Sequence, residues 1–268
     1  MLLMSITLFH KDQFEAIKKA GLLAGEALDL ACRSVKAGMS TWDLDQIAEE
    51  WIRSQGAIPT FKGYSGFPAS LCTSVNQEVV HGIPNKKKIL KEGDIVSLDI
   101  GVTVKEKFDG IEWGYIGDTA RTVTVGEVSN SVKKLLEDTD LSLYEGIKCC
   151  KAGMTIKDIS IAVEKVAKKN NYGIVRMFGG HGIGPKYHSD PFIPNWADYF
   201  SFNDNTEIKP GMLLCIEPMF NLGGDDVRKL KDDWTIVTAD HKLSAHFEHT
   251  ILITENESIV TTRTEGKK

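Results

Sequence analysis

The sequence predicts a mixed α/β fold, a single domain made of two related halves at about residues 1–128 and 129–268. A helix-end motif occurs twice, as Lys-Ala-Gly-Met-Ser followed by Asp43 and as Lys-Ala-Gly-Met-Thr followed by Asp158. A Lys-x-Gly motif also precedes an acid at the same spacing in both halves, once before Asp99 and once before Glu217. Such self-similarity usually reflects repeated structure. Because ligand sites tend to form between domains or repeats, we expect a site shared by the halves.

The composition is that of an ordinary globular protein. With 268 residues, 42% of them hydrophobic, the chain can bury about 70–75% of its unfolded surface. A formal net charge of −5 argues against nucleic acid as the main partner. The five cysteines include no Cys-x-x-Cys pair, which indicates a reducing compartment. Residues 1–10 lack the pattern of a signal peptide and no apolar run is long enough to span a membrane, so we expect a cytoplasmic protein.

In the first half, two helices precede the first strands. An amphipathic pattern over residues 12–37 predicts a helix that Gly38 ends. Ser40 and Asp43 have the spacing of a capping box, which predicts that a second helix begins there. Residues 57–70 are rich in glycine, proline and aromatic residues and predict a loop. Two short strands are expected at residues 71–75 and 79–80, and His81 follows the second.

Residues 94–121 predict a β-hairpin with an acid on each arm. Asp99 interrupts an apolar, β-branched run, and Asp118 begins an alternating segment. Asp109-Gly110 between them is a strong turn signal, so we assign Asp109 to the turn. Two strand-borne acids facing each other need a cation. A salt bridge to Arg121 or to a lysine is the alternative to a metal at this stage.

The second half adds a histidine and two more acids in buried surroundings. Helices are expected at residues 129–150 and 155–170. His181 lies in a glycine-rich segment, which lets the backbone approach a ligand closely. Glu217 and Glu248 each interrupt an apolar strand-like run. Four carboxylates brought together without compensation would repel, and two divalent cations balance their charge. Oxygen ligands with a single imidazole suit Mn, Fe, Co or Zn ions.

The ordered motifs of the chain resemble those of type I methionine aminopeptidases in their short bacterial or organellar form. The motifs are Val80–Pro84, Leu98–Ile100, Gly117–Thr119, Gly180–Gly184, Ile216–Met219 and Phe247–Thr250. The resemblance implies the pita-bread fold, two pseudo-symmetric halves of antiparallel β-sheet covered by helices around a dinuclear metal centre. It also implies removal of the initiator methionine from nascent proteins, preferentially when the second residue is small, by attack of a metal-bridging water or hydroxide on the scissile carbonyl.

The resemblance also implies a role for each candidate residue. Asp99 would bind one metal, Asp118 and Glu248 would bridge both, and His181 and Glu217 would complete the second. Glu217 would accept a proton, His188 would stabilise the oxyanion, and His81 would contact the substrate near the scissile amide. Thr119, His246 and His249 are candidates for supporting contacts. The methionine pocket would be lined by Tyr64, Phe67, Cys72, His81, Tyr187, His188 and Trp234.

The chain departs from the family pattern in two places. The connection between Asp99 and Asp118 is about eight residues longer than in the common bacterial form, and Phe61 and Tyr187 occupy pocket positions where other members often differ. The expected partners are nascent polypeptide N-termini and, transiently, the ribosome, with no membrane and no direct nucleic-acid function, and the protein is expected to be a monomer.

Three alternative functions stay open at this stage. One is a proline-directed peptidase of the same fold, which would normally carry a further amino-terminal domain. Another is a pita-bread binding module without activity, although such modules usually lose metal ligands. The third, nucleic-acid binding, rests on lysine clusters and the tail Arg263–Lys268 alone.

Overall fold

The computed structural model describes residues 6–201 and 206–264. The first five residues of the segment 1–10, and residues 265–268 of the basic tail that begins at Arg263, therefore lie outside the described residues. Within the described ranges, none of the helices combines the length and the apolar composition that a membrane crossing requires.

The helices of the first half form where the sequence predicts them. The short helix η1 (Lys11–Gln13) leads into α1 (Phe14–Ser34), which ends three residues before the predicted 37 because Val35 is extended (φ −62°, ψ 124°). Helix α2 (Thr41–Ser54) begins with the predicted capping box, in which Ser40 and Asp43 bond each other's backbone N–H groups. The elements that follow are β1 (Ile58–Pro59), η2 (Tyr64–Gly66), β2 (Cys72–Val75) and β3 (Glu78–Val80).

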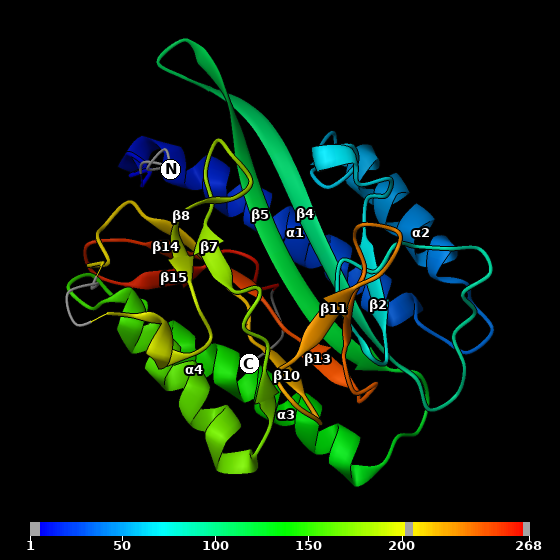
Figure 1. The fold of residues 1–268 in the computed structure, drawn as a ribbon. Coiled ribbons are helices and arrows are strands. Elements are labelled where there is room, and N and C mark those ends of the chain that lie inside the picture. Colours follow the sequence, from blue (N-terminus) through cyan, green and yellow to red (C-terminus); the bar gives the residue numbers. More distant parts are fainter. Residues whose placement is uncertain (1–5, 202–205, 265–268) are drawn as a thin grey trace.

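The predicted hairpin is confirmed and forms the longest element of the fold. Strands β4 (Ile95–Phe108) and β5 (Ile111–Thr124) pair without interruption from Ile95↔Thr124 to Phe108↔Ile111. Asp109 and Gly110 form the two-residue turn, both with positive φ (50° and 77°), as a type I′ turn requires. The additional length is thus paired strand, and its tip projects beyond the body of the protein (Figure 1).

The second half contains two helices and most of the short strands. Helices α3 (Asn130–Lys148) and α4 (Ile156–Asn170) lie side by side (Figure 1). The strands, with one short helix among them, are β6 (Gly173–Ile174), β7 (Gly180–Gly182), β8 (Ser189–Ile193), η3 (Ala197–Tyr199), β9 (Leu213–Ile216), β10 (Met219–Asn221), β11 (Val227–Lys229), β12 (Ile236–Thr238), β13 (Ser244–His246), β14 (His249–Ile253) and β15 (Ser258–Val260).

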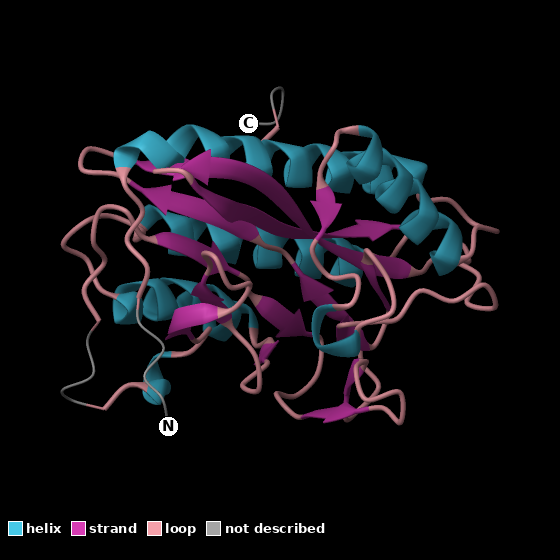
Figure 2. Cartoon of the chain, turned by 90° about the horizontal axis from the view of Figure 1, so that it is seen from above, coloured by secondary structure: helices cyan, strands magenta, loops and turns pink. Residues whose placement is uncertain are grey.

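Antiparallel sheets carry the site, and helices border them. One sheet has the order β1-β4-β2 with β5 paired to β4, and the largest has the order β15-β14-β9-β7-β8. A bridge between Ala120 and Glu248 joins β5 of the first sheet to the segment that enters β14 of the second. Two smaller sheets have the orders β13-β10-β6 and β11-β12-β3. Helix α1 packs along the β4–β5 hairpin, and a row of helices borders the strands along the upper edge of Figure 2.

The two copies of the helix-end motif make the same contacts. Gly38 (φ 88°) donates its N–H to Leu90 O at 2.8 Å, and Gly153 (φ 86°) donates to Ile208 O at 3.0 Å. Positive φ at these turns favours glycine, because glycine has no Cβ. Buried apolar residues also form one large cluster around α1, α2 and β4 and another around α3, α4 and β9. These likenesses support the two related halves, whose boundary near residue 128 stays a prediction.

Candidate metal centre and adjoining pocket

Strand register brings the predicted metal ligands to one place. Gly101 pairs with Asp118, so Asp99, two residues before Gly101, lies on the same face of the hairpin as a diagonal neighbour of Asp118. The Ala120–Glu248 bridge then brings Glu248 beside the hairpin. In the adjacent sheet, β9 lies between β14 and β7 and pairs with both. His181 on β7 and Glu217, just after the end of β9, are therefore close to Glu248.

The ligand atoms of these residues are close to one another and largely buried. His181 Nε2 lies 3.9 Å from Asp118 Oδ2 and 3.6 Å from Glu217 Oε1. Donor atoms of Asp118, His181, Cys215 and Glu248 all lie within 4.8 Å of one another. Asp118 is completely buried, and the exposed fraction of Glu248 is 2%, of His181 6% and of Asp99 8%. The side chain of Glu217 is 13% exposed, so the cluster is reached from its side.

The carboxylates lack the partners that would balance their charge. Burial and the neighbouring acids raise the pKa of Asp99, Glu217 and Glu248 well above the usual range, and burial raises the pKa of Asp118 to about 7. Among the described residues, Asp99 Oδ1, both carboxylate oxygens of Asp118 and Glu248 Oε1 have no partner at hydrogen-bond distance and angle, although the nearby Tyr187 hydroxyl and Thr119 N–H lower the pKa of Asp118 against the effect of burial. Burial lowers the pKa of His181 to about 3, so its imidazole is neutral and able to bind a metal.

The salt-bridge alternative for the hairpin acids is therefore wrong. Arg121 pairs instead with Asp29, Nη1 to Oδ1, at 2.5 Å. Within residues 6–201 and 206–264, none of the lysine and arginine ion pairs includes Asp99, Asp118, Glu217 or Glu248. Unpaired buried carboxylate oxygens beside a neutral imidazole are a donor set that fits divalent cations.

Hydrogen bonds to backbone carbonyl groups hold the segments of Asp118 and Glu248 together. Thr119 Oγ1 donates to Glu248 O at 2.7 Å, and Thr250 Oγ1 donates to Asp118 O at 2.7 Å. Glu248 N–H donates to Ala120 O at 2.9 Å. The supporting contact of Thr119 is thus made to the backbone of the neighbouring acid, and it fixes the separation of the two strands.

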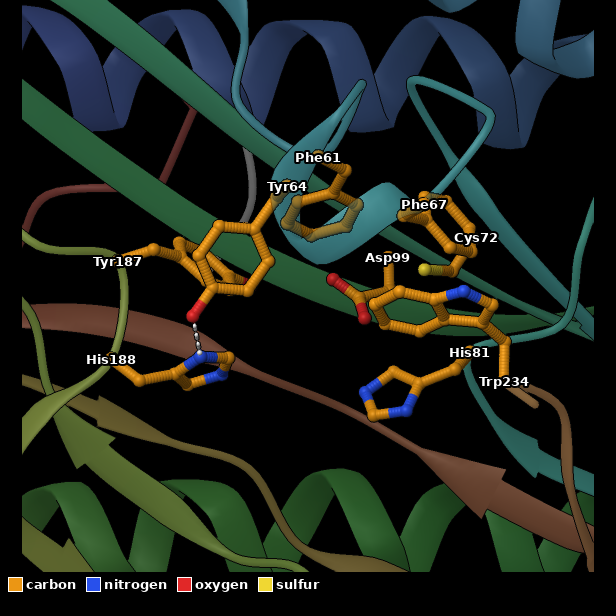
Figure 3. Close-up of a pocket in the computed structure, with 9 residues that line it drawn as sticks. All are labelled: Phe61, Tyr64, Phe67, Cys72, His81, Asp99, Tyr187, His188 and Trp234. Atoms are coloured by element: carbon orange, nitrogen blue, oxygen red, sulfur yellow. Dashed lines mark hydrogen bonds between the residues drawn. The ribbon is translucent and has the colours of Figure 1, made fainter. Parts of the chain in front are cut away.

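An aromatic pocket adjoins the acids (Figure 3). Its volume is about 60 Å³. Phe67 and Trp234 are in edge contact with ring centroids 5.1 Å apart, and Tyr64 and Tyr187 are in a similar contact at 5.1 Å. Asp99 belongs both to this lining and to the acid cluster, so the pocket opens onto the candidate metal centre. All seven predicted pocket residues line it, together with Asp99 and Phe61: Tyr64, Phe67, Cys72, His81, Tyr187, His188 and Trp234.

Two neutral histidines lie at opposite sides of the pocket (Figure 3). His188 Nδ1 is hydrogen-bonded to the Tyr64 hydroxyl at 2.9 Å, and burial lowers the pKa of His188 to about 4. His81 has φ 59°, a left-handed conformation that non-glycine residues rarely adopt. Burial also lowers the pKa of His81 to about 4. Strain at a side chain aimed into a pocket is typical of functional sites.

Comparison with known proteins identifies the family. Residues 15–255 match metallopeptidase family M24. The chain belongs to this family. It is 46% identical over 247 residues to methionine aminopeptidase 1 of Bacillus subtilis, a match that covers 92% of this chain and 95% of the relative.

Solved structures of M24 peptidases confirm the predicted pita-bread fold. The structure of a methionine aminopeptidase from Rickettsia prowazekii matches with a TM-score of 0.89 and 39% identity, over 97% of this chain and 100% of that one. An Xaa-Pro dipeptidase from Bacillus anthracis shares the fold alone, with a TM-score of 0.70 and 19% identity, over 97% of this chain and 63% of that one.

One member of this M24 cluster, Cys215, has no role predicted from the sequence. Its Sγ lies among the donor atoms of Asp118, His181 and Glu248. Burial and the nearby carboxylates raise the pKa of the Cys215 thiol well above its usual value, as burial and neighbouring acids do for the carboxylates beside it. Its position near the acids could have been predicted from the sequence, because Cys215 precedes Glu217 by two residues and alternate residues of a strand lie on the same face.

The two histidines that flank Glu248 differ in what they face. His246 Nε2 lies 3.6 Å from Glu217 Oε2, on the side of the cluster. His249 turns away from the acids, with Nδ1 2.8 Å from Thr262 Oγ1 and 3.5 Å from Thr119 Oγ1, and with Nε2 3.3 Å from the Tyr144 hydroxyl. Of this pair, only His246 faces a predicted metal ligand.

Proposed function

We propose that this M24 peptidase is a metal-dependent aminopeptidase that removes the initiator methionine from nascent proteins, preferentially when the second residue is small. The observation that carries the proposal is the unpaired acid cluster that opens, through Asp99, onto an aromatic pocket. A thioether packs well against aromatic rings, and an uncharged pocket rejects charged side chains because they would lose their hydration. The names of the relatives agree with this assignment.

We propose that two divalent ions, Co, Mn, Fe or Zn, are held by Asp99, Asp118, His181, Glu217 and Glu248. Asp118 and Glu248 would hold the ions from neighbouring strands, which the Ala120–Glu248 bridge joins. Bound ions would act as Lewis acids and would lower the pKa of a bound water toward about 7.

The protein's own residues position the peptide and move the proton. Glu217 is the proton acceptor in this proposal, since it is the most exposed of the four acids and lies beside neutral imidazoles. His188, held by Tyr64, donates a hydrogen bond to the developing oxyanion. His81 contacts the substrate near the scissile amide, and Trp234 and Phe67 enclose the methionine side chain.

The test is mass-spectrometric cleavage of Met-Ala-Ser and Leu-Pro-Gly peptides by metal-free protein, with Mn²⁺ or Co²⁺ restored singly. Release of methionine from the first peptide alone, and only with metal, is the expected result. Cleavage of the second peptide alone would favour the proline-directed alternative, for which the likeness extends to the fold alone. If the folded protein cleaves neither peptide, a binding module without activity is favoured.

The cellular setting is part of the same proposal. We infer a cytoplasmic monomer that acts on nascent polypeptide N-termini and meets the ribosome transiently. A sedimentation experiment with ribosomes and a molecular-mass measurement in solution test these two points separately.

A further inference from the structure

Glu217 lies between two imidazoles that face its two oxygens separately. Oε1 is 3.6 Å from His181 Nε2, and Oε2 is 3.6 Å from His246 Nε2. The backbone of Glu217 is also held, because Asn195 Nδ2 donates to its carbonyl oxygen at 3.0 Å. What remains to be fixed is the rotation of the carboxylate, which decides which oxygen points to the candidate metal centre.

His246 is held by its backbone, but its side chain makes no hydrogen bond with the described residues. Its exposed fraction is 1%, and neither ring nitrogen has a hydrogen-bond partner among the described residues. Its backbone N–H donates to Thr122 Oγ1 at 2.8 Å, and the Thr122 hydroxyl donates to its carbonyl oxygen at 2.9 Å. Its strand β13 pairs with β10, where Met219 lies opposite it and two residues after Glu217. A buried unpaired imidazole costs stability, which a role at the site would explain.

We propose that His246 is a positioning residue that donates its Nε2–H to Glu217 Oε2 and so leaves Oε1 free for the metal. The inference rests on the proposed function, in which Glu217 is a ligand and the proton acceptor. The distance between His246 Nε2 and Glu217 Oε2 is roughly a few tenths of an ångström longer than a hydrogen bond. Hydrogen bonds in active sites often shorten only when metal or substrate is bound. Ligands held by an outer hydrogen bond in this way are better ordered and more basic.

The chemistry of the imidazole suits this role. A neutral imidazole carries one N–H, and a carboxylate beside Nε2 favours the tautomer with the proton there. Nδ1 is then an acceptor, and it is buried on the side away from that carboxylate. A positively charged residue in this place would compete with the metal for Glu217, whereas a neutral donor orients the carboxylate without neutralising it.

The experiment compares three variants of the full-length protein. His246→Leu removes the donor with little change in size, and His246→Gln keeps an N–H donor at a similar distance from the backbone. His249→Gln is the comparison variant, because His249 flanks Glu248 from the other side and its ring nitrogens lie against Thr262, Tyr144 and, at 3.5 Å, the Thr119 hydroxyl, and not against a carboxylate of the site. Mn²⁺ affinity of the metal-free proteins is measured by calorimetry, together with thermal unfolding and with kcat and KM for release of methionine from Met-Ala-Ser.

The expected result is that His246→Leu lowers Mn²⁺ affinity by about 10- to 100-fold, while His246→Gln stays within about threefold of the parent protein. Under saturating metal, His246→Leu lowers kcat and leaves KM nearly unchanged, because it acts through the proton acceptor. Metal-free His246→Leu unfolds at the same or a higher temperature than the parent, since it removes unpaired buried nitrogens. A larger loss of Mn²⁺ affinity in His249→Gln than in His246→Leu contradicts the proposal.

Two further results would overturn it. Unchanged Mn²⁺ affinity in His246→Leu would show that Glu217 needs no such support. Equal losses in His246→Leu and His246→Gln would show that the imidazole acts by shape and not by its N–H. Failure of the proposed function would look different. A parent protein that binds Mn²⁺ but does not release methionine would contradict that function, while the Mn²⁺ affinities of the three variants could still be compared with that of the parent.

Discussion

At Gly117 the packing of the fold and the placement of a predicted metal ligand depend on each other. Gly117 precedes Asp118 on β5, and α1 passes across it at very close range. A Cβ added at Gly117 would lie 2.5 Å from Gly21 Cα and 2.7 Å from both Ala20 O and Gly21 N. All three atoms belong to the backbone of α1, so no side-chain rotation can relieve the contact. We predict that Gly117→Ala forces the helix and the strand apart.

The magnitude follows from this geometry. Overpacking a filled core costs about 1–3 kcal/mol, and contact with an immobile backbone places this case near the upper end. Replacement of glycine within a strand returns about 0.5–1 kcal/mol, because alanine loses less conformational freedom on folding. The expected net loss in the free energy of unfolding is therefore about 2–2.5 kcal/mol, with weaker Mn²⁺ binding because Asp118 moves with the strand.

Urea denaturation of the metal-free protein measures the effect, and Gly114→Ala is the control. Gly114 lies on the same strand, but a Cβ there would meet only Thr103 Cγ2, at 3.3 Å, which can yield slightly. We expect that control to change the free energy of unfolding by less than about 1 kcal/mol. Equal losses in the two variants would refute the argument from the contact with α1.

Three other predictions concern the site. Asp118→Ala abolishes methionine release while Asp109→Ala, in the hairpin turn, leaves kcat/KM near that of the parent; equal loss would contradict the ligand assignment. Tyr64→Phe lowers kcat by about five- to tenfold, because it removes the hydrogen bond to His188, with little change in melting temperature, and a normal kcat would show that the bond is dispensable. Metal-free protein melts at a lower temperature at pH 8 than at pH 6.5. Burial raises the pKa of Asp118 from its usual 3.8 to about 7, so the folded state retains a proton that the unfolded chain releases, and stability falls as the pH rises through 7. The buried histidines act in the opposite direction, because burial lowers their pKa values while the unfolded imidazoles still bind protons near pH 6.5. The raised pKa values of Asp99, Glu217 and Glu248 add to the effect of Asp118, so Asp118→Asn should lose less stability than the parent between pH 6.5 and pH 8, and an equal loss would contradict the assignment.

Elements defined by local signals could be predicted from the sequence. The Asp109-Gly110 turn requires positive φ at two successive residues, and the capping box at Ser40 satisfies helix N–H groups within four residues. The acids could be found for a related reason, since an acid inside an apolar strand run needs a specific explanation. Their convergence was predicted from the repeat and the family motifs, and strand register then brings them together.

Contacts that depend on register between distant strands could not be predicted. Nothing near His246 in the sequence indicates that it faces Glu217, because that contact depends on the pairing of β13 with β10 across the intervening β11 and β12. The left-handed conformation of His81 could not be predicted either, since histidine, although enriched in that conformation, adopts it at few positions. Both cases involve a histidine held at some cost in stability beside unpaired acids. At His246 the free energy that the metal-free fold loses is what binding of cations would recover, so replacement of His246 by an apolar residue should preserve or raise the stability of the metal-free protein while it lowers metal affinity.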